Sequence, residues 1–394
     1  MIVVVMSTRR IYMDYAATTP IDPLVVRMML PYFSEKFGNT ASLHQEGSEA
    51  GIALERSRKI IAKILGAKET EVYFTSSATE SNNTVIKGIT WANKEKGKHI
   101  IISATEHDCV MESAKWMEKQ GFEVTKLPVD ENGLVKIEEL KKAIKKETIL
   151  VSVIHANNEV GTINNIEEIG KICREAGVYF HTDASQSFGK IPIDVAKMKI
   201  DLLTASSHKI YGPKGAAILY IREGVKIEAL LHGGGHEGGM RSATVNVPAI
   251  VGMAKAAEIC NNEMAEESAR LMQLRDKMIQ NILKNIEGTR LNGDPVKRLP
   301  NNVNISFENV EGESILMMLD QEGVAVSTGS ACSSRTLEPS HVLTAMGLEA
   351  KVAHGSIRFS LGRWTTEKEV NYVLEILPKI ILKLRQISPF KTKI

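Results

Sequence analysis

Residues 148–187 read TILVSVIHANNEVGTINNIEEIGKICREAGVYFHTDASQS, and this stretch decides the fold. An apolar run of strand length opens it, apolar residues at helical spacing follow over 165–177, and a second apolar run begins at residue 178. The order predicts a strand, a helix and a strand. Because both strands are continuously apolar, we expect a parallel sheet that helices cover on both faces.

The same alternation continues along the chain on both sides of this unit. Further strands are predicted at 71–77, 98–107, 122–130 and 201–209, with helices such as 78–97 and 108–121 between several of them. A long helical region follows at 247–282, and its pattern fits one helix or two. After it, a smaller α+β unit is predicted from the segments 301–307, 313–323 and 355–364 and a final helix from about Thr366.

The predicted fold is therefore α/β, with two domains. The large domain, residues 18–262, is built on the mainly parallel sheet. The small C-terminal domain, residues 263–394, is α+β, and the N-terminal segment 1–17 is expected to join this small domain. A chain of 394 residues is long enough for this division.

Composition excludes several classes of protein. The net charge is +2, from 49 basic and 47 acidic residues, which gives no electrostatic reason to expect nucleic acid or an anionic membrane as a partner. The N-terminus MIVVVMSTRR has too few apolar residues for a signal peptide or a membrane span, and a short buried strand is expected there. Four widely spaced cysteines form neither a disulfide framework nor a zinc pattern, so we expect a reducing, cytoplasmic location.

Polar side chains gather where the predicted strands end. The carboxyl ends of parallel strands meet at one edge of an open α/β sheet, and that edge binds ligands. One polar strand end is commonplace, whereas five together predict a site. The five are TSSATES (75–81), ATEH (104–107), HANNEVG (155–161), HTDASQS (181–187) and TASSHKIYGPKG (204–215).

The first of these stretches predicts the start of a helix. Ser77 and Glu80 have the spacing of a capping box. The free N–H groups and the dipole of such a helix, with the Thr79 hydroxyl, would hold a phosphate. Taken alone, the stretch is better explained by a simple helix cap.

Two other strand ends carry charged side chains. Asp183 ends an apolar run, so its carboxylate is expected to be buried and to need a cation, either a protonated pyridinium nitrogen or a salt-bridge partner. Lys209 and Lys214 are both candidates for a lysine that forms a Schiff base. Lys214 lies inside a Pro/Gly turn and is expected to be solvated, so Lys209 is the better candidate, with a plain surface lysine as the alternative.

These residues belong to a longer set of motifs. Together the motifs resemble a cysteine desulfurase of the NifS/IscS type, a fold-type I enzyme dependent on pyridoxal 5′-phosphate (PLP), and they follow the family's order from about residue 12 to residue 366. They read MDYAATTP (13–20), TSSATESNN (75–83), EHDCVME (106–112), HANNEVG (155–161), HTDASQSFGK (181–190), SSHKIYGPKG (206–215), HGGGHEGGMRSAT (232–244), STGSACSSRTLEPSHVL (327–343) and SIRFSLGRWT (356–365).

The resemblance implies a role for each site residue. Lys209 would hold PLP covalently, Asp183 would pair with the pyridinium nitrogen, and Gln186 would bind the phenolic oxygen. His107 would stack on the ring and relay protons, Asn158 would lie beside ring and substrate, and Arg358 would clamp the substrate carboxylate. The phosphate would be bound by Ala78, Thr79, Ser206 and His208, with Thr244 reaching it from the other subunit of a homodimer.

The resemblance also gives a role to Cys332, in STGSACSSR (327–335). Its thiolate would attack the sulfur of PLP-bound L-cysteine, which leaves L-alanine and a persulfide on Cys332. The small, polar neighbours predict a flexible loop. Cys173 and Cys260 are expected in the core and Cys109 in packing. No metal site is predicted with certainty, and Cys332 is a candidate ligand of an iron–sulfur cluster.

The implied function is delivery of cysteine sulfur to iron–sulfur cluster assembly, through a scaffold or other acceptor protein, and to tRNA thiolation. Ser77 and Ala243 stand where the family often has Gly, Gly238 replaces an Arg, and the short ending QISPFKTKI leaves the acceptor open. A related enzyme, such as a selenocysteine lyase or an aminotransferase, would need Lys209 and Asp183 but not Cys332. A non-catalytic sulfur-carrier subunit would need none of the PLP-binding residues, so their presence argues against it.

Overall fold

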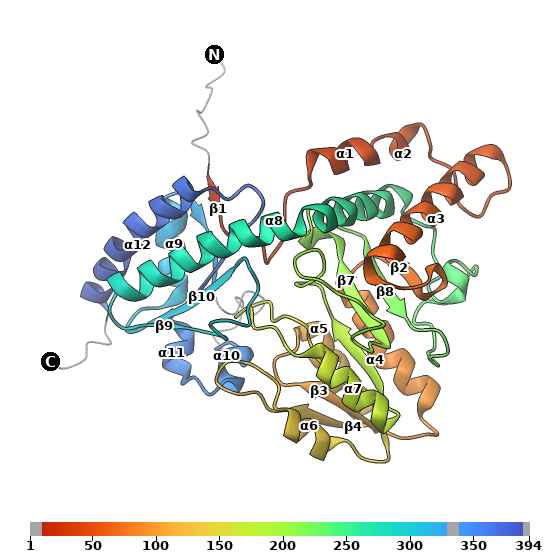
Figure 1. Cartoon of the computed structure of the whole chain (residues 1–394), viewed down its shortest axis with the longest axis horizontal. Coiled ribbons are helices and arrows are strands. Elements are labelled where there is room, and N and C mark those ends of the chain that lie inside the picture. Colours follow the sequence, from red (N-terminus) through yellow and green to blue (C-terminus); the bar gives the residue numbers. More distant parts are fainter. Residues whose placement is uncertain (1–9, 329–338, 389–394) are drawn as a thin grey trace.

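The computed structural model describes residues 10–328 and 339–388 (Figure 1). Cys332 therefore lies outside the described residues, and so does most of the N-terminal stretch for which a buried strand was predicted. The described part has two sheets of four or more strands, and the long helix α8 runs from one to the other.

The larger sheet has seven strands and is mainly parallel, as predicted. Strand β8 runs antiparallel to both of its neighbours, so the other six strands share one direction. In spatial order the strands are β2 (Val72–Thr75), β8 (Ala217–Ile221), β7 (Leu202–Ser206), β6 (Tyr179–Asp183), β5 (Thr148–Ser152), β3 (His99–Ser103) and β4 (Glu123–Leu127).

The smaller sheet is antiparallel and has four strands. They are β12 (Ser327–Thr328), β13 (Ser356–Ser360), β10 (Asn302–Phe307) and β9 (Thr289–Leu291). Beside it, β1 (Ile11–Tyr12) pairs in parallel with β11 (Val324–Ala325). The N-terminal segment therefore joins the C-terminal unit by strand pairing.

Helices cover both faces of the larger sheet, because successive strand residues point to opposite sides. In β3, Ile100 and Ile102 belong to one core cluster with residues of α4 and α5, whereas Ile101 belongs to the cluster on the other face, which includes residues of α3, α6, α7 and α8. The helices are α1 (Pro23–Met29), α2 (Pro31–Ser34), α3 (Gln45–Leu65), α4 (Ala78–Asn93), α5 (Asp108–Lys119), α6 (Ile137–Ala143), α7 (Ile166–Ala176), α8 (Val247–Asn285), α9 (Gly312–Gln321), α10 (His341–Ala345), α11 (Ala350–His354) and α12 (Glu367–Ile387).

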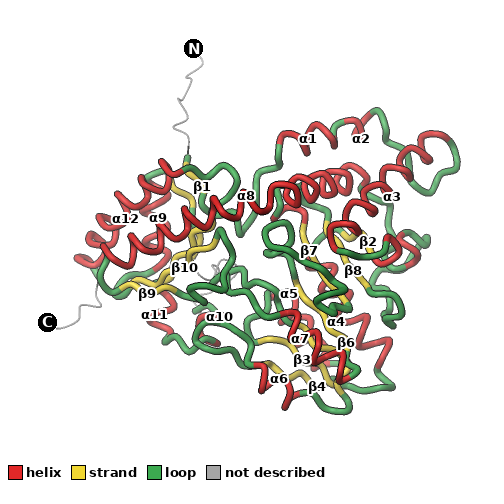
Figure 2. The backbone as a smooth tube through the Cα atoms, in the orientation of Figure 1, coloured by secondary structure: helices red, strands yellow, loops and turns green. Residues whose placement is uncertain are grey.

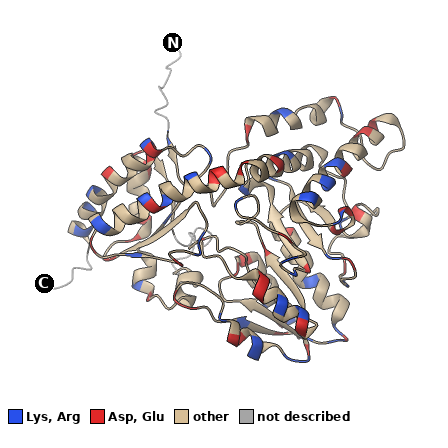
Figure 3. Ribbon diagram, in the orientation of Figure 1, with Lys and Arg blue, Asp and Glu red and all other residues tan. Residues whose placement is uncertain are grey.

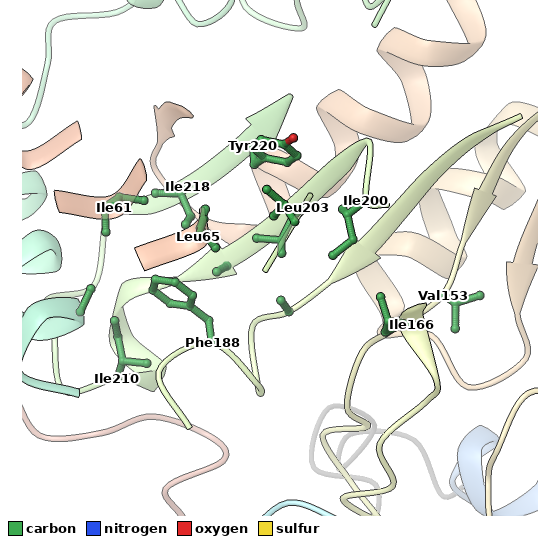
Figure 4. Close-up of a cluster of buried hydrophobic side chains, with 14 of the residues drawn as sticks. Ile61, Leu65, Val153, Ile166, Phe188, Ile200, Leu203, Ile210, Ile218 and Tyr220 are labelled. Carbon is green, nitrogen blue, oxygen red and sulfur yellow. The ribbon is translucent and has the colours of Figure 1, made fainter. Parts of the chain in front are cut away.

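The core on the α3 side is shown in Figure 4. Leu203 of β7 and Ile218 of β8 lie in one cluster with Ile61 and Leu65 of α3, and all four side chains are buried. Burying an aliphatic side chain contributes about 1.5–3 kcal/mol. This packing fixes the sheet whose strand ends carry the candidate site.

Helix α8 is a single helix of 39 residues, which answers the question that the sequence left open. The Asn246 side chain caps its first turn, and Pro248 occupies a position where a missing N–H costs nothing. Its N-terminal half packs into the core of the larger sheet, and its C-terminal half, from Leu271, packs into the core of the smaller one. The core that α8 joins changes between Cys260 and Leu271, and side chains of α10 and α11 also join the larger core, so the division at residue 262 stays a prediction.

The segment between β8 and α8, residues 222–246, is loop apart from one short 3-10 turn, Glu237–Gly239 (Figure 2). Acidic and basic residues both occur on helices such as α7 and α12 (Figure 3). Within residues 10–328 and 339–388, no helix is long and apolar enough to cross a membrane.

Candidate active site

The five polar stretches meet at one edge of the larger sheet. Each follows the carboxyl end of a strand that shares the common direction: β2, β3, β5, β6 or β7. They line a cavity of about 440 Å³, within the usual size of a small-molecule site. Ten residues predicted for the site line it: Ala78, Thr79, His107, Asn158, Asp183, Gln186, Ser206, His208, Lys209 and Arg358.

Thr244 does not line this cavity. It lines a neighbouring cavity of about 310 Å³, and Ser76 and Gly215 line both. A residue expected to reach the phosphate from another subunit need not line the cavity of its own chain. Cys332 lies outside the described residues.

Asp183 ends β6 with its side chain pointing into the site, and only 4% of the residue is exposed. Its Oδ1 accepts from the backbone N–H of Ser185 at 2.9 Å, and its Oδ2 accepts from Nδ2 of Asn82 at 2.7 Å. Among the described residues, no Lys, Arg or His lies within ion-pairing distance of this carboxylate. The salt bridge that was the alternative explanation is therefore absent from that part of the chain.

Lys209 lies in a 3-10 turn directly after β7. Its Nζ donates to the carbonyl oxygens of Ala16 and Ala17, at 2.5 and 2.6 Å. Gln186 donates to the same Ala16 carbonyl at 2.9 Å. Lys214 also lines the cavity but is exposed, as its position in the turn predicted. The more sheltered amine is that of Lys209.

The N-terminus of α4 forms one wall of the cavity. Ser77 caps the helix by accepting from the N–H of Glu80, as predicted. The other half of the predicted capping box is wrong, because the Glu80 carboxylate turns to Ser76 and to Arg241, whose Nε lies 2.7 Å away. The free helix N–H groups and the hydroxyls of Ser77 and Thr79 remain available to an anion.

His208 completes this wall. Burial, and then the nearby lysines, lower the pKa of its imidazole to about 4, so the ring is neutral at physiological pH. Its Nδ1 lies 3.1 Å from Oγ1 of Thr18. A neutral ring in this place would offer a phosphate a hydrogen bond and not a charge.

Arg358 comes from β13 of the smaller sheet and reaches the cavity with only 1% of the residue exposed. Its Nη1 donates to the carbonyl oxygen of Asn158 at 2.8 Å, and its Nη2 donates to Oδ1 of Asp14 at 2.9 Å. Its Nε is buried and has no acceptor among the described residues. An Arg held in this way retains donors for a carboxylate.

His107 caps α5 and lines the cavity, and Cys109 stands beside it. The Cys109 Sγ lies 3.1 Å from Nδ1 of His107 and 3.1 Å from Nδ2 of Asn82. Cys109 was expected in packing alone. The structure places it in the wall of the cavity, because the first turn of α5 faces the sheet edge. Cys173 and Cys260 are buried, as expected.

Two buried acids lie next to site residues in the sequence. Burial raises the pKa of Glu106 to about 8 and that of Glu159 to about 7. Glu106 accepts from Ser103 and from the backbone N–H of Ile154, and Glu159 accepts from Ser340. These contacts fix the loops that carry His107 and Asn158.

Several cavity residues were not predicted as site residues. Ala16 and Ala17, of the motif MDYAATTP, line the cavity, whereas Asp14 of the same motif and Asn82 of TSSATESNN contact the lining residues Arg358 and Asp183, so both motifs were noticed without a role for these members. Over the described ranges, no group of three or more His, Cys, Asp or Glu side chains is placed to hold a metal ion.

The cavity fits PLP. It offers a sheltered lysine amine, a helix N-terminus for the phosphate, and a buried carboxylate that lacks a cation in the described part of the chain. A pyridinium N–H would supply that cation. Fold and site together define a fold-type I, PLP-dependent enzyme.

Comparison with known proteins places the chain within that class. The family model of the class-V aminotransferases matches residues 11–373. Cysteine desulfurase IscS of Dictyoglomus turgidum is 54% identical over 97% of each chain, and that of Methanosarcina thermophila is 52% identical over 98% of this chain and 96% of its own. Among solved structures, a NifS-like protein superposes with a TM-score of 0.90 at 40% identity, covering 95% of this chain and all of that one.

A further solved structure, of SspA in complex with cysteine, is 37% identical with a TM-score of 0.81, and the match covers 90% of this chain and 99% of that one. The chain therefore belongs to the class-V aminotransferase family and, within it, to the cysteine desulfurases of the NifS/IscS type. Its cofactor is PLP.

Proposed function

We propose that this enzyme transfers sulfur from L-cysteine to Cys332 and releases L-alanine. The Cβ–S bond of the substrate breaks, the carbon takes up a proton, and the released sulfur joins the Cys332 sulfur as a persulfide. Atoms and electrons balance without an external oxidant. The names of the IscS relatives and the cysteine bound in SspA support L-cysteine as the substrate.

One observation carries the proposal: ten residues predicted from separate segments of the chain line a single cavity that fits PLP. PLP supplies an electron sink for the amino acid substrate. Lys209 would bind it covalently, Asp183 would hold the proton on its ring nitrogen, and Gln186 would donate to its phenolic oxygen with the amide hydrogen that Ala16 leaves unused.

The substrate carboxylate would bind Arg358. The guanidinium is already held by Asp14 and by the Asn158 carbonyl, so no rotamer freedom is lost when the substrate arrives. The buried Nε, which lacks an acceptor in the described residues, would donate to the carboxylate. The backbone carbonyl of Asn158 accepts from the Arg358 guanidinium, and Asn158 would help to orient the substrate.

The chemistry of the other thiols supports Cys332 as the sulfur acceptor. The nucleophile in thiol chemistry is the thiolate. Burial raises the pKa of Cys109 and of Cys260 to about 12, and it also raises the pKa of Cys173. The three described cysteines are therefore protonated at neutral pH and are poor nucleophiles.

A homodimer is the proposed assembly. Thr244 lies beside the cavity of its own chain but not in it, so a partner's Thr244 would supply that contact. Large apolar side chains on and near α1, α2 and α3 are exposed, a feature of protein interfaces. They are Leu24, Met28, Leu30, Phe33, Phe37 and Ile52.

Delivery of sulfur to a scaffold or acceptor protein of iron–sulfur cluster assembly would follow the transfer to Cys332, in keeping with the IscS relatives. Four widely separated cysteines support a reducing, cytoplasmic compartment.

The test is an assay of alanine and sulfide from L-cysteine, with and without a reductant. Equal amounts of alanine and persulfide are expected in a single turnover without reductant, and repeated turnover with sulfide release when reductant is present. Alanine without any enzyme-bound sulfur, or no alanine at all, would refute the proposal.

A further inference from the structure

A continuous set of hydrogen-bond contacts connects Asp183 and His107, which both line the cavity. Asp183 Oδ2 accepts from Asn82 Nδ2 at 2.7 Å, the same nitrogen lies 3.1 Å from the Cys109 sulfur, and that sulfur lies 3.1 Å from Nδ1 of His107. Asn82 and Asp183 are buried, and Cys109 is largely shielded. Cys109 is thus the link between His107 and the rest of the network.

The direction of each hydrogen bond follows from one backbone group. The N–H of Cys109 donates to Nδ1 of His107 at 3.2 Å, and an amide nitrogen cannot accept. Nδ1 is therefore the acceptor, and the neutral imidazole carries its proton on Nε2. The hydrogen in the contact between the Cys109 sulfur and Nδ1 can then come only from the S–H, while the Asn82 amide donates to the sulfur and the Thr79 hydroxyl is a further hydrogen-bond partner of that sulfur.

The surroundings keep the proton on the sulfur. Burial, followed by the charge of Asp183 on β6, raises the pKa of the Cys109 thiol. Glu106, at the end of β3, acts in the same direction. Lys209 lines the same cavity from the turn after β7. A transfer of the thiol proton to His107 would put a second negative charge beside Asp183, which the buried site disfavours.

We propose that Cys109 is a positioning residue for His107. Its thiol donates to Nδ1, lowers the basicity of the imidazole, and holds the ring with its N–H on Nε2 and its lone pair turned toward α5. The role of His107 in turnover rests on the proposed function. The position of the proton on its imidazole ring does not.

Histidine-selective ¹³C,¹⁵N labelling tests this directly by NMR, with the His107 signals assigned from their loss in His107→Gln. In the wild type, His107 should show an unprotonated Nδ1 above its pKa. In Cys109→Ala, loss of a hydrogen bond to the neutral ring should raise the His107 pKa by about 0.5–1 unit. Cys109→Ser keeps a donor and should stay within about 0.3 unit of the wild type.

Cys173→Ala is the matched control, because it removes a buried thiol from α7, outside the site, and should leave the titration of His107 unchanged. The positioning role is overturned if Nδ1 carries the proton in the neutral ring, or if Cys109→Ala titrates as the wild type does. A shifted titration in a protein that makes no alanine from cysteine would leave this role standing while refuting the proposed function.

Discussion

The buried guanidinium of Arg358 and the partly exposed carboxylate of Asp14 form an ion pair, with Nη2 and Oδ1 at 2.9 Å, although 344 residues separate them. The pair joins the smaller sheet to the N-terminal segment at the cavity. Both residues lie in recognisable motifs, yet only Arg358 was assigned a role from the sequence.

Asp14→Ala should destabilise the protein, because it leaves the buried Arg358 charge without its partner. Removal of one member of a buried pair costs on the order of 3 kcal/mol. Urea unfolding at constant pH measures this loss. Glu46→Ala removes an exposed carboxylate paired only with His44 and should change the free energy of unfolding by less than about 1 kcal/mol. An equal free energy of unfolding for Asp14→Ala and the wild type would show that the ion pair does not stabilise the protein.

Lys209→Ala should abolish covalent attachment of PLP, because its amine is the sheltered one in the cavity. Borohydride reduction followed by peptide mapping should label Lys209 in the wild type and no residue in the variant. The variant Lys214→Ala should still be labelled at Lys209, because the exposed Lys214 is not expected to bind the cofactor. A label on Lys214 in the wild type would contradict the assignment.

Glu106→Gln should change how stability depends on pH. The carboxyl of Glu106 has its pKa raised by burial to about 8, above the ordinary value of 4.5. Between these values the folded state holds a proton that the unfolded state releases, so the contribution of Glu106 to stability is lost as pH rises. Gln cannot ionise. The difference in free energy of unfolding between the variant and the wild type should therefore move in favour of the variant by on the order of 4 kcal/mol as the pH rises from about 5 to about 9.

Urea unfolding at the two pH values measures that difference. Glu159 ionises in a similar range in both proteins, so it cancels in the comparison. A stability difference that stays constant with pH would mean that Glu106 is already ionised in the folded protein.

Phe33→Glu should weaken the proposed homodimer. The Phe33 side chain is 62% exposed near the end of α2, beside other exposed apolar residues. An aromatic residue central to an interface contributes at least about 2 kcal/mol, which corresponds to a dissociation constant raised roughly 30-fold. Sedimentation over a range of concentrations measures it. Met317→Glu, on α9 and 64% exposed, is the control and should sediment as the wild type does.

The sequence predicted much of the site because of how parallel sheets are built. Asp183 and Lys209 each follow a continuously apolar strand, and strands with a common direction bring their carboxyl ends to one edge. A periodic pattern thus places such residues without any knowledge of tertiary contacts.

Other site features depend on contacts that no local pattern encodes. Ala16 reaches the cavity and Asp14 reaches Arg358 from an N-terminal segment whose Ile11 pairs with Val324, a residue far away in the sequence. Cys109 has the sequence pattern of a packed helical residue, and only the orientation of the first turn of α5 brings its thiol to His107. Only half of the predicted capping box forms, because the Glu80 carboxylate binds Arg241, which lies 161 residues away in the sequence.

Cys332→Ala should separate cofactor binding from sulfur transfer. Binding of PLP and of cysteine depends on Lys209, Asp183 and Arg358, which this change leaves in place, so the spectral change on adding cysteine should persist. Persulfide should not form and sulfide release should nearly vanish, because the three described thiols have raised pKa values. Mass spectrometry of wild-type peptides after one turnover should find the added sulfur on the peptide with Cys332, and Cys109→Ala should leave that label in place. Sulfur on Cys109, or normal sulfide release by Cys332→Ala, would refute Cys332 as the acceptor.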